Sequence, residues 1–318
     1  DNEPGKGDHC HIDGHEADVH VVEVNGDLRL DTVYSNRAVT LEALNGSILD
    51  GVDDSMPNIQ TVQLTLTAAE SIGQAGNYLD LDLDQSTGAL IANAVQSLYV
   101  AEYAGDLRIL DATAANGDLG LRADASILDL NDDLAAHVRG DSVSLEAGQR
   151  IGASGNDFLI DSRFSGSSNV TLRTGLDMHV RETAGDLWLN TVTVGAGTAF
   201  IKAPAGSILN RRATLPAEGP NVLSGHVWLL AAQDIGEEGT PIVTEVGNIE
   251  SWSQSGSTYV QNLGALTVGG VPGTAGGAGM EAGGSLHLGA SSPITVTEDQ
   301  IAEGYILIVT GDDDADAD

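Results

Sequence analysis

The segment VHVVEVNGDLRL at residues 19–30 returns as LYVAEYAGDLRI at 98–109 and as MHVRETAGDLWL at 178–189. The Gly-Asp-Leu triplets inside these copies start at Gly26, Gly105 and Gly185, so their spacing is nearly constant. A fourth, degenerate copy carries Gly264-Ala265-Leu266 at the next place in the series. Self-similarity at a fixed period is the signature of repeat architectures, so the repeat decides the fold before any local pattern is considered.

Two further landmarks keep the same period and the same order within each copy. The triplet Ser-Ile-Leu starts at Ser47, Ser126 and Ser207. The motif Ile-Gly-x-x-Gly-Asn starts at Ile72 and Ile151, and a looser version, which ends in Thr, starts at Ile235. Three landmarks in one order in three copies establish the repeat.

Within a copy the hydrophobic period is two, as in Leu79, Leu81 and Leu83, which alternate with aspartates. Such alternation over a short segment indicates half-buried β-strands. Gly, Asn, Ser and Asp separate these strands at short, regular intervals and supply turn chemistry. The sequence therefore predicts an all-β chain, and we identify no convincing helix.

Many short strands with regular turns fit either tandem sandwich domains or a β-solenoid. A copy of about 80 residues is short for a sandwich domain, and strand signals run on from copy to copy without a linker. We therefore predict a parallel β-solenoid with about 20 residues per turn, about four turns per copy and about sixteen turns in all. The expected divisions are an acidic His- and Cys-containing segment at 1–16, repeats at 17–94, 95–174 and 175–254, a degenerate repeat at 255–310, and an acidic tail at 311–318.

The copies resemble the repeats of very large bacterial surface proteins of the filamentous-haemagglutinin and giant-adhesin type. The likeness lies in VRETAGDL at 180–187, AGSILN at 205–210 and SLEAGQRIG at 144–152. It covers roughly residues 17 to 254, and weakly extends to 310. The resemblance implies a right-handed parallel β-helix exported to the bacterial cell surface, where it acts as a stalk, adhesin or fibre. It implies no catalytic residue, because the shared motifs are turn and core positions. The chain is far shorter than a giant adhesin.

Charge and composition exclude several classes of function. The chain has 318 residues, with 47 acidic and 13 basic side chains, and a formal net charge of −34. Such a charge repels phosphate, so neither nucleic acid nor an anionic membrane surface is an expected partner. No apolar stretch approaches the length that a membrane-spanning helix needs. The chain starts Asp1-Asn2-Glu3-Pro4 without a visible secretory signal, so we expect a mature product or a fragment of a longer protein.

Acidic residues raise the question of calcium. Asp80, Asp82 and Asp84 alternate along one strand and share one face. Calcium needs six to eight converging oxygens, and neither an EF-hand loop nor a calcium-binding nonapeptide is present. We expect no required cofactor and a diffuse association of calcium with the acidic surface, with these three aspartates as the weak alternative of a specific site. The recurring Asp27, Asp106 and Asp186 are better explained as turn residues than as calcium ligands.

The N-terminal segment contains a second set of ligand types. Four of the eight histidines precede residue 21, and Cys10, His11 and His15 could hold zinc, copper or nickel. Their spacing matches no standard zinc finger, and a Gly-rich terminus is often mobile. A solvated tail is therefore the competing interpretation, and Cys10 could also join two chains.

The last strand leads to the expected function. Tyr305, Ile306 and Ile308 lie in a stretch that is apolar on both faces, which is typical of a strand buried on both sides. No capping helix is visible, so we expect head-to-tail stacking of copies into an extracellular homopolymer or stalk. An adhesin that binds a surface glycan through Trp188, Trp228 and Trp252 is the alternative. A β-helical polysaccharide-degrading enzyme is the least favoured, because basic and stacking residues are scarce; we expect no enzymatic activity.

Overall fold

The computed structural model describes residues 10–52, 54, 56–131, 133–162, 168–212, 219–274 and 279–311. The first nine residues of the expected N-terminal segment lie outside this set, as does the acidic tail after Gly311. The acidic loop residues Asp53 and Asp132 also fall outside it.

The chain divides into two compact units. Unit 1 is Asp1–Gln149 with Asp161–Ser167, and unit 2 is Arg150–Ile160 with Ser168–Asp318. The residues described in both units lie in strands, isolated bridges, turns, bends or irregular segments, and none is helical, which confirms the all-β prediction. Accordingly, the described part of the chain contains no helix with the length and hydrophobicity needed to cross a bilayer.

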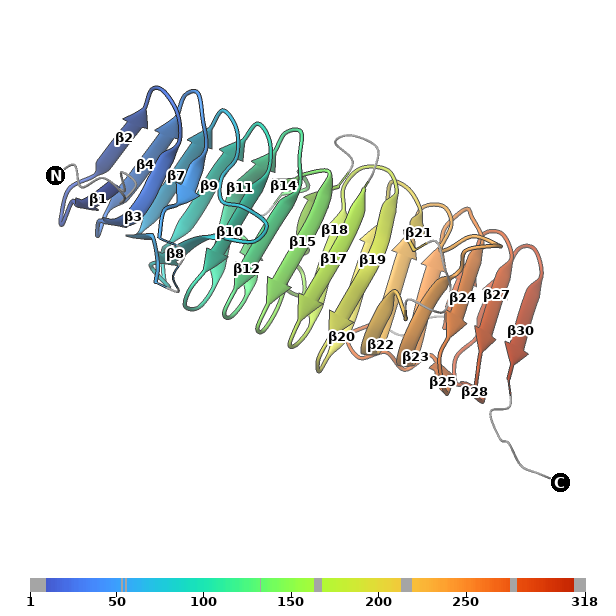
Figure 1. Ribbon diagram of the computed structural model, residues 1–318. Coiled ribbons are helices and arrows are strands. Elements are labelled where there is room, and N and C mark those ends of the chain that lie inside the picture. Colours follow the sequence, from blue (N-terminus) through green and yellow to red (C-terminus); the bar gives the residue numbers. More distant parts are fainter. Residues whose placement is uncertain are drawn as a thin grey trace. The chain divides into compact units, whose positions relative to one another are not determined.

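Unit 1 consists of parallel strands stacked turn upon turn (Figure 1). One stack runs β2–β4–β7–β9–β11, and the other runs β1–β3–β6–β8–β10–β12–β15. The strands are β1 (Cys10–Asp13), β2 (Val19–Glu23), β3 (Leu28–Tyr34), β4 (Ala38–Ala43), β5 (Ile48–Asp50), β6 (Ile59–Thr61), β7 (Gln63–Ala68), β8 (Leu79–Leu83), β9 (Ala89–Ala94), β10 (Leu98–Glu102), β11 (Leu107–Ala114), β12 (Leu119–Ala123), β13 (Ile127–Asp129), β14 (Val138–Arg139) and β15 (Ser142–Ala147).

Unit 2 follows the same plan. Its stacks run β18–β20–β22–β23–β26–β29 and β17–β19–β22–β23–β24–β27–β30, so the long strands β22 and β23 belong to both. The strands are β16 (Phe158–Asp161), β17 (Asn169–Thr174), β18 (Met178–Glu182), β19 (Leu187–Val194), β20 (Thr198–Ala203), β21 (Ile208–Asn210), β22 (Val222–Ala231), β23 (Ile242–Ser253), β24 (Thr258–Asn262), β25 (Leu266–Val268), β26 (Met280–Ala282), β27 (Leu286–Ala290), β28 (Ile294–Val296), β29 (Gln300–Ala302) and β30 (Ile306–Thr310).

The solenoid has about 13 turns, fewer than the sixteen expected. The reason is that turns differ in length. Ile249 pairs with Val268 in the next turn, whereas Val192 pairs with Val222, which is a path more than half as long again. Many turns carry a loop in addition to their strands, so the same chain makes fewer turns than a uniform short period would give.

The pairing also relates the sequence repeat to the turns of unit 1. Leu28 pairs with Ile48, and the series continues one turn at a time through Ile72, Leu98 and Leu119. The counterpart of Leu28 in the second copy is Leu107, which falls between the last two members of this series. The period of the sequence is therefore longer than three turns of this series and shorter than four. Equivalent strands such as β3 and β11 consequently belong to different stacks.

The core of each unit is a narrow column of aliphatic side chains. Along β8 the leucines face inward and the aspartates face outward, as the alternation predicts. Leu107, which the sequence places in the core, is fully buried. Full burial of such a side chain stabilises the fold by about 1.5–3 kcal/mol. Leu, Ile, Val and Ala fill most of the column, and aromatic residues are rare in it.

Two of the sequence landmarks are partners in consecutive turns. The glycines of the Gly-Asp-Leu triplets have positive φ, which places the aspartate at the corner before the strand. The aspartate Oδ1 then accepts a hydrogen bond from the backbone N–H of the serine in the next Ser-Ile-Leu triplet. The pairs are Asp27 and Ser47 (3.1 Å), Asp106 and Ser126 (3.0 Å), and Asp186 and Ser207 (2.8 Å).

At the same corner in the following turns, side-chain oxygens accept hydrogen bonds from backbone N–H groups. In unit 2, Ser207 Oγ accepts from the backbone N–H of Asp234, and Asp234 Oδ1 accepts from that of Ser257. Ser257 Oγ accepts from Ser285, whose own hydroxyl accepts from Tyr305 in the last turn. Each turn thereby satisfies one corner N–H of the turn that follows it, which matters because an unpaired buried N–H is costly.

Candidate functional site

The third landmark, Ile-Gly-x-x-Gly, forms a tight hairpin at a corner of the solenoid. Antiparallel bridges close it at Gln74 and Asn77, at Ala153 and Asn156, and at Glu237 and Thr240. The first glycine of each hairpin has positive φ, between 62° and 69°. A Cβ there would collide with a backbone carbonyl of the next turn, namely that of Tyr99, His179 or Tyr259. Glycine is therefore required by conformation and by space.

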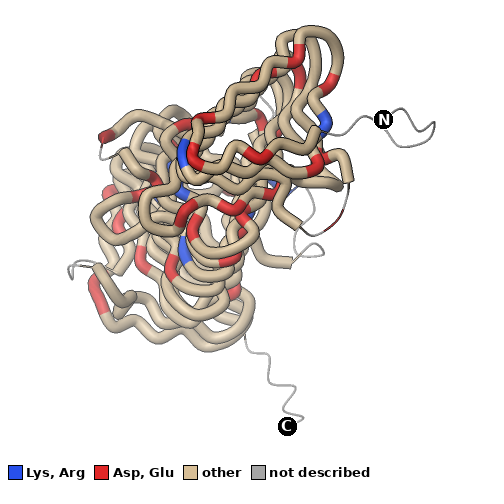
Figure 2. The backbone as a smooth tube through the Cα atoms, turned by 90° about the vertical axis from the view of Figure 1, so that its left-hand side faces the viewer, with Lys and Arg blue, Asp and Glu red and all other residues tan. Residues whose placement is uncertain are grey.

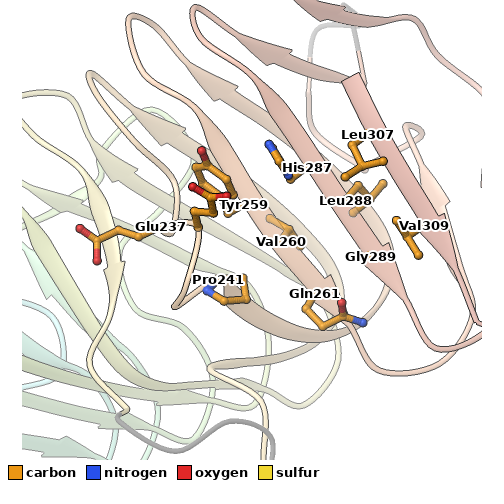
Figure 3. Close-up of a pocket in the computed structure, with 11 residues that line it drawn as sticks. Glu237, Pro241, Tyr259, Val260, Gln261, His287, Leu288, Gly289, Leu307 and Val309 are labelled. Atoms are coloured by element: carbon orange, nitrogen blue, oxygen red, sulfur yellow. The ribbon is translucent and has the colours of Figure 1, made fainter. Parts of the chain in front are cut away.

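A pocket of about 310 Å³ opens beside the third hairpin, within unit 2 (Figure 3). Its floor is the outward surface of β24, β27 and β30, and its side is the hairpin that contains Glu237 and Glu238. Tyr259 and His287 stand in register on β24 and β27, and their ring centres are 4.5 Å apart. The other polar and small residues that contribute are Pro241, Gln261 and Gly289.

The pocket is acidic on one side and aromatic on another. Glu237 accepts a hydrogen bond from the Thr240 hydroxyl at 3.2 Å, which holds it to the hairpin. Its neighbour Glu238 is exposed. The His287 Nε2 atom is buried and has no hydrogen-bond partner among the described residues. The lining includes no Lys or Arg, so the pocket can offer a ligand a carboxylate, aromatic faces and an amide.

The second feature of interest is the last turn, β28 to β30. Within the described residues, β30 has one pairing, with β27. Leu286 and Leu288 of β27 are at most 1% exposed, whereas Ile306 and Ile308, directly above them, are 44% and 37% exposed. The same inward positions are thus buried in one turn and open in the next. Tyr305, at the adjoining corner, is 55% exposed.

Two of the three tryptophans lie on directly paired strands of unit 2. Trp228 pairs with Glu250, and Trp252 pairs with Leu230, so these two tryptophans lie on neighbouring strands of one stack. Trp188 pairs with Leu209 on a different pair of strands, β19 and β21. Trp252 is the most open of the three, with 42% of its surface exposed.

Two of the three N-terminal candidate ligands lie in a strand, and His15 lies in the turn that follows it. Cys10 and His11 are in β1, which pairs with β3, and their side chains alternate between the two faces of the strand. Burial raises the pKa of the Cys10 thiol and so disfavours the thiolate that a metal would need. His11 lies 4.0 Å from Asp31, and His15 lies 3.7 Å from Asp13. The structure thus directs Cys10 and His11 away from each other.

The three aspartates of the alternative calcium site, Asp80, Asp82 and Asp84, have different surroundings. Asp84 accepts hydrogen bonds from the hydroxyls and backbone N–H groups of Ser86 and Thr87, which lower its pKa to about 2. Asp82 accepts one from the Gln60 amide at 2.9 Å. Burial, and repulsion by Asp50 and Asp54, raise the pKa of Asp80 to about 6. Across the described ranges, no three His, Cys, Asp or Glu side chains are grouped to hold a metal ion.

Acidic residues are spread around the turns, and basic residues are few (Figure 2). Several of the basic residues are held by a nearby carboxylate, as Arg139 is by Asp111 at 3.5 Å. The remaining acidic surface is exposed to solvent, where mobile cations screen its repulsion.

Sequence reasoning missed the pocket at β24, β27 and β30. Tyr259 and His287 lie far apart in the sequence, and no motif links them. Alignment of the three hairpin motifs contains one signal for this pocket. The two central residues are Gln74-Ala75 in the first copy and Ala153-Ser154 in the second, but they are Glu237-Glu238 in the third. That change concentrates charge at one corner.

No protein-family model, no curated protein sequence and no solved structure matches this chain.

Proposed function

We propose that this protein is a structural subunit of an extracellular bacterial filament or cell-surface stalk, which grows by end-to-end stacking of solenoid turns. The observation that carries the proposal is the open last turn. Ile306 and Ile308 occupy inward positions that are buried one turn earlier, and in β30 they are more than a third exposed. One further turn of parallel strand would bury them and pair the free backbone groups of β30.

The occupant we propose for this surface is the first turn of a second copy. In the first turn, β2 alternates between inward and outward side chains and has one described pairing, with β4. Its inward Val19 and Val21 can continue the aliphatic column that ends at Ile306 and Ile308. Burying each isoleucine would contribute about 1 kcal/mol, beside the new backbone hydrogen bonds. Contact between the last turn of one copy and the first turn of the next is heterologous and does not close, so it produces a filament.

The finer features of the fold belong to the same proposal. We take the solenoid to be right-handed and built from the sequence repeats at 17–94, 95–174, 175–254 and 255–310. In support, the Asp-to-Ser pairing recurs at equivalent positions, and so do the corner hairpins. We further propose that the likeness to surface-fibre repeats reflects a shared role outside the cell, without enzymatic activity.

Electron microscopy and sedimentation of the purified protein test the proposal. We expect rods that lengthen with protein concentration and with salt, because salt screens the repulsion between copies of charge −34. The double variant Ile306→Lys/Ile308→Lys should remain monomeric and keep its β-rich circular dichroism. Leu44→Lys, at a site in unit 1 that is 48% exposed, is the matched control and should still assemble. If the wild-type protein stays monomeric at high concentration and high salt, the filament proposal is wrong and a monomeric cell-surface stalk is favoured.

A glycan-binding adhesin is the second candidate function. The observation in its favour is the open face of Trp252 next to the strand of Trp228, because exposed indole rings stack well on sugars. Trp252→Ala should abolish hits on a glycan array if this face binds a glycan. Glycan-array signals that neither Trp188→Ala nor Trp252→Ala reduces would show that the tryptophans do not form the site.

A further inference from the structure

Three corners of the solenoid are equivalent by strand register. The residues whose carbonyls lie against the first hairpin glycines are Tyr99, His179 and Tyr259. Each is paired with a residue in the following turn: Tyr99 with Gly120, His179 with Phe200, and Tyr259 with His287. Two positions beyond these partners, on the same outward face, stand Arg122, Lys202 and Gly289. The three corners can therefore be compared position by position.

At the first corner, a basic side chain of unit 1 itself fills the space. The guanidinium carbon of Arg122 lies 4.0 Å from the ring centre of Tyr78, the residue that follows the hairpin. Its Nε atom is 3.4 Å from a carboxylate oxygen of Glu146. Gly120 leaves room for this arrangement, because a Cβ there would meet the Tyr78 hydroxyl and the Tyr99 ring.

At the second corner, a basic side chain of unit 2 does the same. The Lys202 ammonium contacts both carboxylate oxygens of Asp157, at 2.7 and 2.8 Å, and lies 5.6 Å from the ring centre of Trp228. Asp157 occupies the position of Tyr78. Both corners therefore bind a cation between an aromatic ring and a carboxylate, which is a favourable combination when it is partly desolvated.

At the third corner the basic residue is replaced by Gly289, and the pocket of about 310 Å³ lies there. Tyr259 and His287 supply aromatic faces there, although Pro241 stands at the position of Tyr78, and the hairpin supplies Glu237 and Glu238. We propose that this pocket binds a small molecule through an alkylammonium or guanidinium group, in the place that Arg122 and Lys202 occupy at the other corners. The proposal is independent of filament assembly.

Titration of the intact protein with ethylguanidinium and butylammonium tests the proposal. Neutral ethylurea and butanol serve as probes of similar shape, and nuclear magnetic resonance at near-physiological salt serves as readout. We expect saturable shifts of the His287 ring signals with both cations and none with the neutral probes. Glu238→Gln should weaken cation binding about two- to fivefold. Glu70→Gln, which removes an exposed charge from unit 1, controls for the general acidity and should change nothing.

A second variant fills the pocket from within. In Gln261→Ala/Gly289→Arg, the third corner takes the Ala101 and Arg122 pattern of the first, and removal of the Gln261 side chain clears the space that a Cβ at Gly289 would need. We expect it to fold and to lose cation binding. Three results would contradict the proposal: neutral probes that bind as well as the cations, equal effects of Glu238→Gln and Glu70→Gln, or cation binding by the filled variant. Each would mean that the cations associate non-specifically with the protein surface. A Lys- or Arg-containing peptide serves as a further probe. If this peptide binds and the free cations do not, the ligand is a protein partner and the proposal of a small molecule is wrong.

Discussion

Asp27 Oδ1 accepts a hydrogen bond from the backbone N–H of Ser47, one full turn later in the solenoid, at 3.1 Å. The two residues belong to different sequence landmarks, and the same link joins Asp186 to Ser207 at 2.8 Å. The recurrence explains why the two landmarks travel together in the sequence. Each of these hydrogen bonds joins the corner of one turn to the corner of the next. The strand ladder cannot supply an acceptor for the serine N–H at this corner.

Replacing the acceptor in this link should weaken unit 2. Asp186→Ala leaves the N–H of Ser207 without its partner, and we expect the free energy of unfolding to fall by about 1–2 kcal/mol. Asp186→Asn keeps an oxygen that can accept and should cost less than half as much. Urea unfolding followed by circular dichroism gives both values. Equal losses in the two variants would show that charge, rather than the hydrogen bond, is what matters at this corner.

The corner hairpins allow a prediction with an internal control. Gly236 has φ of +69°, and a Cβ would collide with the carbonyl oxygen of Tyr259 in the next turn. Gly236→Ala should therefore destabilise unit 2 by about 2 kcal/mol or more. Gly239, in the same hairpin, has nothing within 4 Å of the position of a Cβ.

The control variant Gly239→Ala should change the free energy of unfolding by less than about 0.5 kcal/mol. Thermal melting of the two alanine variants in parallel checks the pair. If both variants melt with the wild type, the hairpin can shift away from Tyr259, and the first glycine is not a steric requirement.

The sequence predicts strands and their inward faces well, because alternation has a fixed period of two. Leu79, Leu81 and Leu83 are buried as expected. Contacts between turns are harder to predict, since they depend on the length of each turn, and turn length varies along the chain. The meeting of Tyr259 with His287 is a consequence of these lengths. A periodic landmark gives the repeat, whereas loop lengths decide which side chains meet.

The carboxyl group of Asp80 should give part of the pH dependence in unit 1. Burial, followed by repulsion from Asp50 and Asp54, raises its pKa to about 6, above the 3.8 of an ordinary aspartate. The folded state therefore holds the proton more tightly, and the stabilising contribution is present below pH 3.8 and lost as the pH rises through 6. Asp80→Asn should raise the free energy of unfolding by about 1 kcal/mol at pH 7 after allowance for solvent screening, and by little at pH 4.

Urea unfolding at pH 4 and pH 7 compares Asp80→Asn with wild type. Asp124→Asn, at an exposed carboxylate of unit 1, is a control for net charge. A gain at pH 7 that Asp124→Asn matches would assign the effect to overall repulsion instead of to the neighbours of Asp80.

Glu102 gives the strongest pH effect that we predict. Its side chain points into the core of unit 1, is 3% exposed, and accepts from the backbone N–H of Leu83 at 3.1 Å. Burial raises the pKa of Glu102 from 4.5 to about 9, and repulsion from Asp82 and Asp106 adds to the rise. The unfolded chain releases this proton near pH 4.5 and the folded chain near pH 9. The free energy of unfolding should therefore fall steadily across that window, by several kcal/mol on an order-of-magnitude basis.

Glu102→Gln removes the proton from this balance and keeps an oxygen that can accept from Leu83. Its free energy of unfolding should equal that of the wild type at pH 5 to within about 1 kcal/mol, the cost of burying the new amide. At pH 9 the variant should be clearly the more stable of the two, because the wild type must then bury a carboxylate. Glu42→Gln, at a carboxylate that contacts His20 at 2.8 Å near the surface, is the control. Parallel pH profiles for wild type and Glu102→Gln would mean that Glu102 titrates normally and that water reaches it inside the turn.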